Sequence, residues 1–290
     1  MASPTVDLHL HTTASDGGTD PRELIREAAA AGLTVVSYCD HESIEGYLQA
    51  REVAQQLGVE VIPGVELVTY FGGREVHLLG YFVEPESPVL RSWLRELRED
   101  RNAVAEQIVH RLNEQGFAIS FDRVQAIATE GVAIGKNHFL WALREAGYIS
   151  TREEMIFMLR TYLSHRGLAY VDYTGNPFAE AVEIIRECGG LPVLAHPGLL
   201  RDDALVLELL KHPGVGLEVY YCYLGDGRDG YIEHYARMAQ ERGLFVTGGS
   251  DYHGRFSPDV KLGRILVPDW VVPRLKAQRA LLEEGVVQSG

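Results

Sequence analysis

The sequence predicts an α/β fold built on a parallel sheet, and two observations carry that prediction. Helical stretches rich in alanine or charged residues end at a glycine and lead into short apolar runs, as in IREAAAAG before LTVVSYC and EIIRECGG before LPVLAH. A glycine just past a helix closes the last turn, and short continuous apolar runs are typical of strands buried on both faces. Repeated alternation of helix and strand favours parallel strands joined by right-handed crossovers.

The first helix is marked at both of its ends. Asp20 can cap it, Pro21 occupies its first position, and Gly32 follows its last turn. The short apolar runs then predict strands near residues 5–10, 34–39, 59–63, 75–83, 191–196, 215–221 and 244–249.

More than 100 residues separate the fourth predicted strand from the fifth. Within this interval, SWLRELREDRNAVAEQIVHRLNEQG, HFLWALREAG and TREEMIFMLRTYL carry apolar residues at helical spacing. We therefore expect an inserted, mostly helical subdomain at residues 87–170, and a strand-bearing domain made of residues 1–86 and 171–290.

The composition excludes several classes of protein. A balance of 27 basic against 41 acidic residues gives a net charge of -14, which disfavours binding to long nucleic acid but leaves a small phosphorylated ligand open. No run approaches the roughly 18 apolar residues of a membrane span, and the first residues lack the pattern of a signal peptide. Three widely spaced cysteines without a CxxC motif favour a reducing cytoplasm.

Residues of the kind that bind metals lie at the ends of the predicted strands. His9 and His11 are two residues apart in DLHLHTTASDG, so in a strand both project to the same face. The other candidates are Asp16, His41, Glu66, His77, His196, Asp251 and His253. Each alone has an ordinary explanation as a loop or turn residue. Because the carboxyl ends of parallel strands gather at one rim of a β/α barrel, the nine together predict a metal site.

The donor set restricts the metal. Nitrogen and carboxylate ligands without thiolates suit Zn, Mn or Fe. Nine ligands exceed what one ion needs, so we expect two or three divalent ions. Ions about 3.5–4 Å apart commonly share a carboxylate and hold a bridging hydroxide, which is suited to phosphoester hydrolysis.

The motifs DLHLHTTASDG, CDH, GVE, AHP and GSDYHG, in this order, resemble the PHP (polymerase and histidinol phosphatase) domain family. The resemblance implies a distorted seven-stranded (β/α)7 TIM-like barrel. It assigns one ion to His9, His11, Glu66 and Asp251, a second to Glu66, His77 and His196, and a third to Asp16, His41 and His253. We expect the catalytic residues to be His9, Glu66, Asp251 and His138.

One position departs from the family pattern. The family usually has a threonine before the Asp-His pair of the second motif, whereas this chain has Cys39. We expect Cys39 to pack as a small apolar residue, with loss of a hydrogen bond. Asp40 is expected to support the ligands without being one.

The helical insertion narrows the branch of the family. With KNHFLWAL and YLSHRGLAYV, it is similar to stand-alone PHP phosphoesterases that act on nucleoside 3′,5′-bisphosphates and short 5′-phosphorylated RNA. Where that branch has an Arg-Pro-His-like stretch, this chain has Lys136-Asn137-His138, and lysine keeps the charge but lacks the bidentate fork of arginine. We expect Lys136 and His138 to bind the substrate phosphate, with the insertion covering the site as a lid. The alternative is that Lys136 is only a lysine at the start of a helix and His138 only a semi-buried histidine.

The leading hypothesis is therefore a metal-dependent phosphomonoesterase acting on a small nucleotide through a metal-bridging hydroxide. Three alternatives stay open: a histidinol phosphate phosphatase, a metal-dependent amidohydrolase that also begins with His-x-His, and a non-catalytic metal-binding PHP module. The additional Asp16 and the Asp251-x-His253 pair favour phosphate chemistry, and the filled ligand positions disfavour an inert module. The oligomeric state is not predicted.

Overall fold

The structure is a computed structural model that describes residues 5–223 and 228–285. The described residues form a single seven-stranded sheet whose strands lie in sequence order. Its two edges meet, because the Asp251 amide donates to the His9 carbonyl at 2.8 Å and the His11 amide donates to the Tyr252 carbonyl at 2.9 Å. The strands are β1 (Thr5–Leu10), β2 (Leu33–Tyr38), β3 (Glu60–Phe71), β4 (Arg74–Tyr81), β5 (Leu191–Leu194), β6 (Gly216–Tyr221) and β7 (Val246–Gly249). The predicted seven-stranded TIM-like barrel is confirmed.

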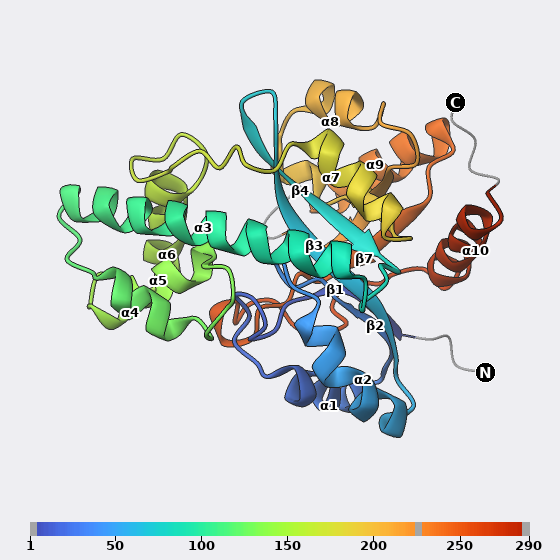
Figure 1. Cartoon of the computed structure of the whole chain (residues 1–290), viewed down its shortest axis with the longest axis horizontal. Helices are drawn as coiled ribbons and strands as arrows, with labels where there is room; N and C mark the ends of the chain where they lie inside the picture. Colours follow the sequence, from blue (N-terminus) through green and yellow to red (C-terminus); the bar gives the residue numbers. More distant parts are fainter. Residues whose placement is uncertain (1–4, 224–227, 286–290) are drawn as a thin grey trace.

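Helices cover the barrel on two sides, with α1 and α2 below the sheet and α7, α8 and α9 above it in Figure 1. The helices are α1 (Pro21–Ala30), α2 (Glu45–Leu57), α3 (Pro88–Glu114), α4 (Phe121–Ile127), α5 (Lys136–Glu145), α6 (Arg152–Met158), α7 (Phe178–Glu187), α8 (Asp203–Leu209), α9 (Arg228–Arg242) and α10 (Val271–Glu283). Short helical turns are η1 (Leu159–Leu163), η2 (Pro197–Leu199) and η3 (Gly254–Phe256). As predicted, Asp20 caps α1 by accepting hydrogen bonds from two amides of its first turn.

The expectation of a wholly parallel sheet is wrong at β4, which runs antiparallel to both β3 and β5. The cause is a tight turn at Gly72-Gly73, where both residues have positive φ, of 55° and 82°. A two-residue hairpin of this kind joins antiparallel strands, whereas parallel neighbours need a crossover. Because β4 is reversed, its beginning lies at the rim where the parallel strands end, and His77 near that beginning faces the site.

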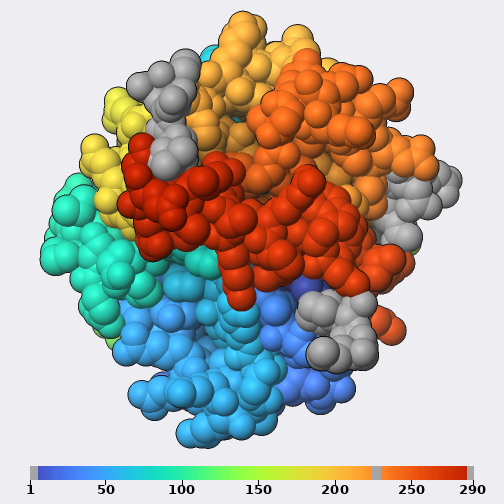
Figure 2. Space-filling model, turned by 90° about the vertical axis from the view of Figure 1, so that its right-hand side faces the viewer, coloured from blue at the N-terminus to red at the C-terminus, as the bar shows by residue number. Residues whose placement is uncertain are grey.

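The main hydrophobic core lies between the barrel and its helices, and it includes buried side chains of α7 such as Phe178 and Ile185. Helix α10 crosses one end of the molecule (Figure 2) and buries Val271 and Leu275 against this core. The insertion and α10 lie at opposite ends of the long axis (Figure 1). Among the described residues, no helix combines the length and the apolar character needed to cross a membrane.

Helix α3 connects the barrel to the helices of the predicted insertion. Ser87 caps its start, and the first half of α3 packs against the barrel core through Leu90, Leu94 and Leu97. Its second half belongs to a separate cluster of buried side chains with α4, α5, α6 and η1, to which it contributes Ala105, Val109 and Leu112. This second cluster agrees with a subdomain at residues 87–170, and the division into domains stays a prediction.

A buried ion pair fixes α3 to the barrel rim. Arg101 pairs with Glu42, whose side chain is fully buried, and the Arg98 guanidinium donates to the Glu42 carbonyl at 2.6 Å. The second carboxylate oxygen of Glu42 accepts from the Val68 amide at 2.8 Å. Since Glu42 follows His41 directly, these contacts place the insertion over the loop that carries a candidate ligand.

Candidate metal centre

Four candidate ligands converge where β1 ends, and we call them the first group: His9, His11, Glu66 and Asp251. The alternation of β1 turns both histidines to one face, while Glu66 comes from β3 and Asp251 from the loop after β7. His9 Nε2 lies 3.1 Å from His11 Nε2 and 3.3 Å from Glu66 Oε2. Asp251 Oδ1 lies 3.1 Å from His11 Nε2 and 3.5 Å from His9 Nε2.

These spacings fit a metal ion. Bonds of about 2.0–2.1 Å to a tetrahedral zinc ion would place neighbouring ligand atoms roughly 3.3–3.4 Å apart. The distances within the first group, 3.1–3.5 Å, bracket that value. Asp251 Oδ1 is buried and has no hydrogen-bond partner within the described ranges, so a cation would satisfy it.

The other oxygen of Glu66 belongs to a second set of contacts. Glu66 Oε1 lies 2.9 Å from His77 Nδ1 and 3.1 Å from His196 Nε2. His41 Nδ1 lies 3.5 Å from Glu66 Oε2, and His41, Glu66 and His77 form a further candidate set. Glu66 thus presents one oxygen to each of two neighbouring positions, which is the geometry of a carboxylate shared by two ions.

A third group joins Asp16, His41 and His253, with His11 at its edge. Asp16 Oδ1 lies 3.2 Å from His253 Nε2 and 3.9 Å from both His41 Nε2 and His11 Nδ1. Asp16 Oδ1 and His41 Nδ1 are buried without a hydrogen-bond partner in the part of the chain that the structure describes. The structure therefore brings all nine predicted residues to one rim, while their roles as ligands stay a prediction.

Mutual contacts control the charges at this rim. Burial alone would raise the pKa of Glu66, but the nearby His9 and His41 hold it well below its usual range. Burial likewise opposes charge on His9, whose pKa is nevertheless raised by the carboxylates of Glu218 and Glu66. The anionic form of Glu66 is therefore favoured. A bound cation would replace the proton that His9 otherwise carries.

Comparison with known protein families agrees with this geometry. The PHP domain family matches residues 7–190, well over half of the 290-residue chain. The chain belongs to the PHP domain family.

Curated relatives of this PHP protein are named for reactions of nucleotides and sugar phosphates. A phosphoribosyl 1,2-cyclic phosphate 1,2-diphosphodiesterase of Eggerthella lenta is 32% identical over 86% of this chain and 94% of its own length. The 5′-3′ exoribonuclease Rnm of Escherichia coli is 31% identical, covering 90% and 88%. A 3′,5′-nucleoside bisphosphate phosphatase of Chromobacterium violaceum is 30% identical, covering 86% and 87%.

Solved structures of the family share the fold. A candidate metal-dependent phosphoesterase from Bifidobacterium adolescentis superposes with a TM-score of 0.83 at 28% identity, covering 96% of this chain and 97% of the other. The family, the barrel and the class of enzyme, a metal-dependent phosphoric ester hydrolase, are thereby confirmed.

One residue of this PHP site was missed by the sequence analysis. Glu218, fully buried in β6, accepts a hydrogen bond from His9 Nδ1 at 2.9 Å and another from the His196 amide at 2.8 Å. A carboxylate behind a ligating histidine fixes its orientation and its tautomer. The signal in the sequence was a lone glutamate within the otherwise apolar run GLEVYY.

The second PHP motif is held by local hydrogen bonds. Asp40 accepts from the Thr12 amide at 2.7 Å and from the Ser15 hydroxyl at 2.6 Å, and burial raises its pKa. This agrees with its expected supporting role. The expected loss of a hydrogen bond at Cys39 is wrong, because its thiol donates to the Leu8 carbonyl at 3.3 Å.

The start of α5 lies directly on the rim. Asn137 Nδ2 donates to Asp16 Oδ2 at 3.2 Å, and a side chain at Gly135 would collide with that carboxylate. Lys136 pairs with Glu75 Oε1, which lies 3.2 Å from His77 Nε2. Sequence reasoning missed Glu75 and Asn137, and the expected contact of Lys136 with the substrate stays a prediction.

His138 has a structural role in addition to the one predicted. Its side chain is 1% exposed, and its Nδ1 accepts a hydrogen bond from the Gly135 amide at 3.1 Å, which caps α5. Burial lowers the pKa of His138 to about 4. A neutral imidazole would contact a phosphate through a hydrogen bond and not as a cation, so its place in the substrate site stays a prediction.

Proposed function

We propose that this PHP protein hydrolyses a phosphate monoester of a small nucleotide, either a nucleoside 3′,5′-bisphosphate or a short 5′-phosphorylated RNA. The observation that carries the proposal is Glu66, with one oxygen 3.3 Å from His9 and the other 2.9 Å from His77. Two cation positions sharing one carboxylate suit in-line displacement at phosphorus. The names of the curated relatives support nucleotides as the substrate class.

Two or three divalent ions, Mn, Zn or Fe, would be held by the three groups. The first would use His9, His11, Glu66 and Asp251; the second Glu66, His77 and His196; the third Asp16, His41 and His253. When bound, such ions polarise phosphoryl oxygens and lower the pKa of water.

Residues of the insertion would position the substrate. Lys136 is 36% exposed and reaches the rim beside Glu75, so its ammonium can exchange this carboxylate for a phosphate oxygen. In a chain of net charge -14, a cation at the rim matters for attracting an anionic substrate. We place His138 at the same end of α5, within the lid formed by residues 87–170.

The alternatives predict different substrates. A histidinol phosphate phosphatase would need no insertion over the rim, and a non-catalytic module would not need three complete ligand groups. An amidohydrolase would leave the Asp16–His253 contact at 3.2 Å without a role. The small phosphorylated substrate therefore remains the best-supported partner.

A panel of phosphate esters with Mn-loaded protein tests the proposal. It should contain adenosine 3′,5′-bisphosphate, a 5′-phosphorylated oligoribonucleotide, histidinol phosphate, a ribosyl 1,2-cyclic phosphate and p-nitrophenyl phosphate. We expect the highest kcat/KM on one of the first two. A preference for histidinol phosphate or for the cyclic phosphate would overturn the nucleotide monoester, and no hydrolysis of any ester would favour the inert module.

A further inference from the structure

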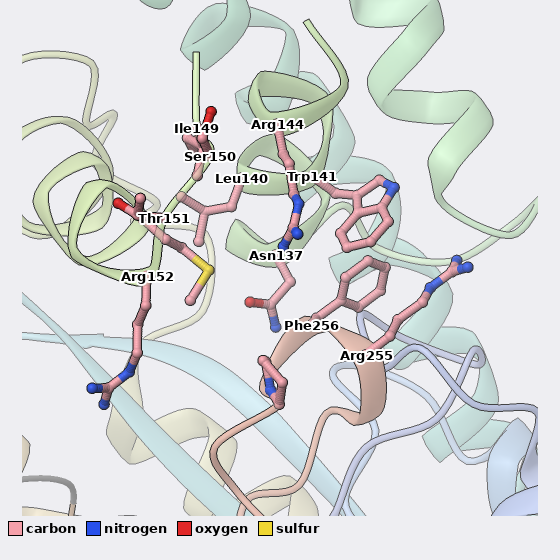
Figure 3. Close-up of a pocket in the computed structure, with 12 residues that line it drawn as sticks. Asn137, Leu140, Trp141, Arg144, Ile149, Ser150, Thr151, Arg152, Arg255 and Phe256 are labelled. Carbon is pink, nitrogen blue, oxygen red and sulfur yellow. The ribbon is translucent and has the colours of Figure 1, made fainter. Parts of the chain in front are cut away.

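A pocket separates the insertion from the barrel loop after β7 (Figure 3). It has a volume of about 150 Å³, and α5, α6 and the segment around η3 form its walls. The lining of the pocket includes Asn137, Leu140, Trp141, Arg144, Met155 and Phe256. The sequence marked none of these residues as functional, although Asn137 lies in the Lys136-Asn137-His138 stretch.

The pocket adjoins the metal centre. Asn137, on its inner wall, donates a hydrogen bond to Asp16 Oδ2 at 3.2 Å. Phe256, on the opposite wall, ends the η3 turn that begins directly after His253, and its amide donates to the His253 carbonyl at 3.3 Å. A ligand whose phosphate lies against the third group would therefore extend past Asn137 into this pocket.

The lower part of the pocket is apolar and aromatic. Leu140 and Phe256 are buried, Met155 is half-buried, and Trp141 meets Phe256 edge to face at 5.1 Å between ring centroids. A cavity of about 150 Å³ lined by such side chains takes a single flat ring system. The shape and the lining thus favour an aromatic ring over a flexible polar chain.

The edge of the pocket is positively charged. The guanidinium of Arg144 lies 5.4 Å from the centre of the Trp141 ring, and that of Arg255 lies 5.3 Å from the same ring centre. Within residues 5–223 and 228–285, no carboxylate pairs with either arginine, whereas Arg152 is paired with Asp259. Two unpaired arginines at one opening stand out in a chain of net charge -14. Figure 3 shows Arg144 directed toward Asn137, the residue that contacts Asp16.

We propose that this pocket binds the base of the substrate nucleotide, and that Arg144 binds the phosphate that is not hydrolysed. The base packs against Leu140, Met155 and Phe256, and Asn137 lies between the base and the reacting phosphate. A phosphate accepts charge-assisted hydrogen bonds from a guanidinium in bidentate geometry, which an arginine without a carboxylate partner can supply. This inference rests on the proposed function and identifies where its specificity arises.

The phosphate contact is tested by Arg144→Ala, with Arg160→Ala as the control. Arg160 is an exposed arginine of the same insertion outside the pocket, so both variants remove one surface charge. We expect Arg144→Ala to raise KM for adenosine 3′,5′-bisphosphate by roughly 10- to 100-fold, as for loss of a charged hydrogen bond. The loss should be smaller for adenosine 3′-monophosphate, which lacks the second phosphate, and Arg160→Ala should change neither value.

The base contact is tested by filling the pocket. Met155→Trp should raise KM for adenosine 3′,5′-bisphosphate at least 10-fold more than KM for ribose 3,5-bisphosphate, which has no base. Phe157→Trp, at an exposed position of the same helix outside the pocket, should behave as the wild type. Circular dichroism and p-nitrophenyl phosphate hydrolysis report whether Met155→Trp folds; if it does not, Leu140→Phe makes the same comparison.

Failure of the subsite proposal and failure of the proposed function give different results. If the wild type hydrolyses nucleotides but the Arg144 and pocket-filling variants leave both KM values unchanged, the subsite is wrong and the proposed function stands. If the wild type hydrolyses none of the nucleotides, the proposed function is overturned, and the subsite with it.

Discussion

The barrel rim and the insertion above it differ in how their polar side chains are held. At the rim, His9 and Glu66 are 0% and 1% exposed, and their neighbours fix them from several strands. In the insertion, Lys136 is 36% exposed and Arg144 lies at the surface. The rim is thus built for fixed coordination, and the insertion presents cations that can move toward a ligand.

We propose that chemistry and selectivity belong to different parts of the chain. The rim is supported by the barrel core, whereas α4, α5 and α6 pack around a second cluster of their own. Changes at exposed residues of the insertion, such as Arg144, are therefore expected to alter substrate choice while the rim keeps its geometry. Substitutions at the rim and in the insertion test that separation.

Glu66→Gln should cause the largest loss. An amide keeps the size of the side chain but removes the charge that would be shared between two ions, so we expect kcat/KM to fall by roughly 10³-fold or more, about 4 kcal/mol. Elemental analysis should find two or three ions per wild-type chain and fewer in the variant. His253→Ala, whose Nε2 faces Asp16 of the third group, should lose less.

The control for Glu66→Gln is Glu60→Gln, at the exposed start of the same strand, where Glu60 pairs with Lys276. It should retain wild-type activity. Full activity of Glu66→Gln with an intact metal content would contradict the shared carboxylate, and at most one tightly held ion in the wild type would contradict the multinuclear centre.

Lys136→Ala should follow, with kcat/KM for adenosine 3′,5′-bisphosphate lowered by roughly 10- to 1,000-fold, since charged hydrogen bonds contribute about 1.5–3 kcal/mol each. His138→Ala should fall in the same range. Hydrolysis of p-nitrophenyl phosphate should suffer less, and the metal content should stay unchanged. Lys211→Ala, at an exposed lysine of the barrel, is the matched control.

The contact of Lys136 with Glu75 sharpens this test. Glu75 also touches His77, so Lys136→Ala could act through the second group instead of the substrate. Glu75→Gln separates the two, because it removes the charge that links Lys136 to His77 and leaves the ammonium free for a phosphate. Equal losses on both substrates together with loss of metal would show that Lys136 serves the rim and not selectivity.

Glu218→Gln should have a smaller effect that appears first in metal binding. The amide oxygen can still accept a hydrogen bond from the His196 backbone, but the negative charge next to His9 is lost. Loss of a carboxylate partner behind a ligating histidine typically changes metal affinity by about 10- to 100-fold. Titration with Mn or Zn measures the shift directly. Glu208→Gln on the surface of α8 is the control, and unchanged affinity in Glu218→Gln would limit Glu218 to packing.

The sequence predicted the strands and the rim because both depend on local patterns. Apolar runs locate β1, β2, β5, β6 and β7 within one or two residues. The direction of β4 was predicted wrongly, although Gly72-Gly73 is a hairpin signal, because the helix–strand alternation was extended over a segment without a helix. Strand ends predicted the rim residues other than His77, which lies within β4.

Contacts between distant segments could not be predicted in the same way. Glu218 meets His9 across 209 positions of sequence, and Asn137 meets Asp16 across 121. Such pairs depend on barrel closure and on how the insertion folds back over the rim. The spacing of residues in a single sequence predicts neither barrel closure nor the position of the insertion over the rim. They were found only from the three-dimensional arrangement.

Cys39→Thr should have the smallest effect of all. The thiol already donates to the Leu8 carbonyl at 3.3 Å, so a hydroxyl would strengthen an existing contact without creating a new one. The added methyl group can face Gly64, which has no side chain; a side-chain carbon there would lie only 3.1 Å from Cys39 Sγ. We expect the free energy of unfolding in urea to change by less than about 1 kcal/mol and kcat to stay within a few-fold of wild type. Cys39→Ala, which removes the donor, should be the less stable of the two variants. A large gain in activity in Cys39→Thr would show instead that the family threonine acts on the metal centre and that Cys39 weakens it.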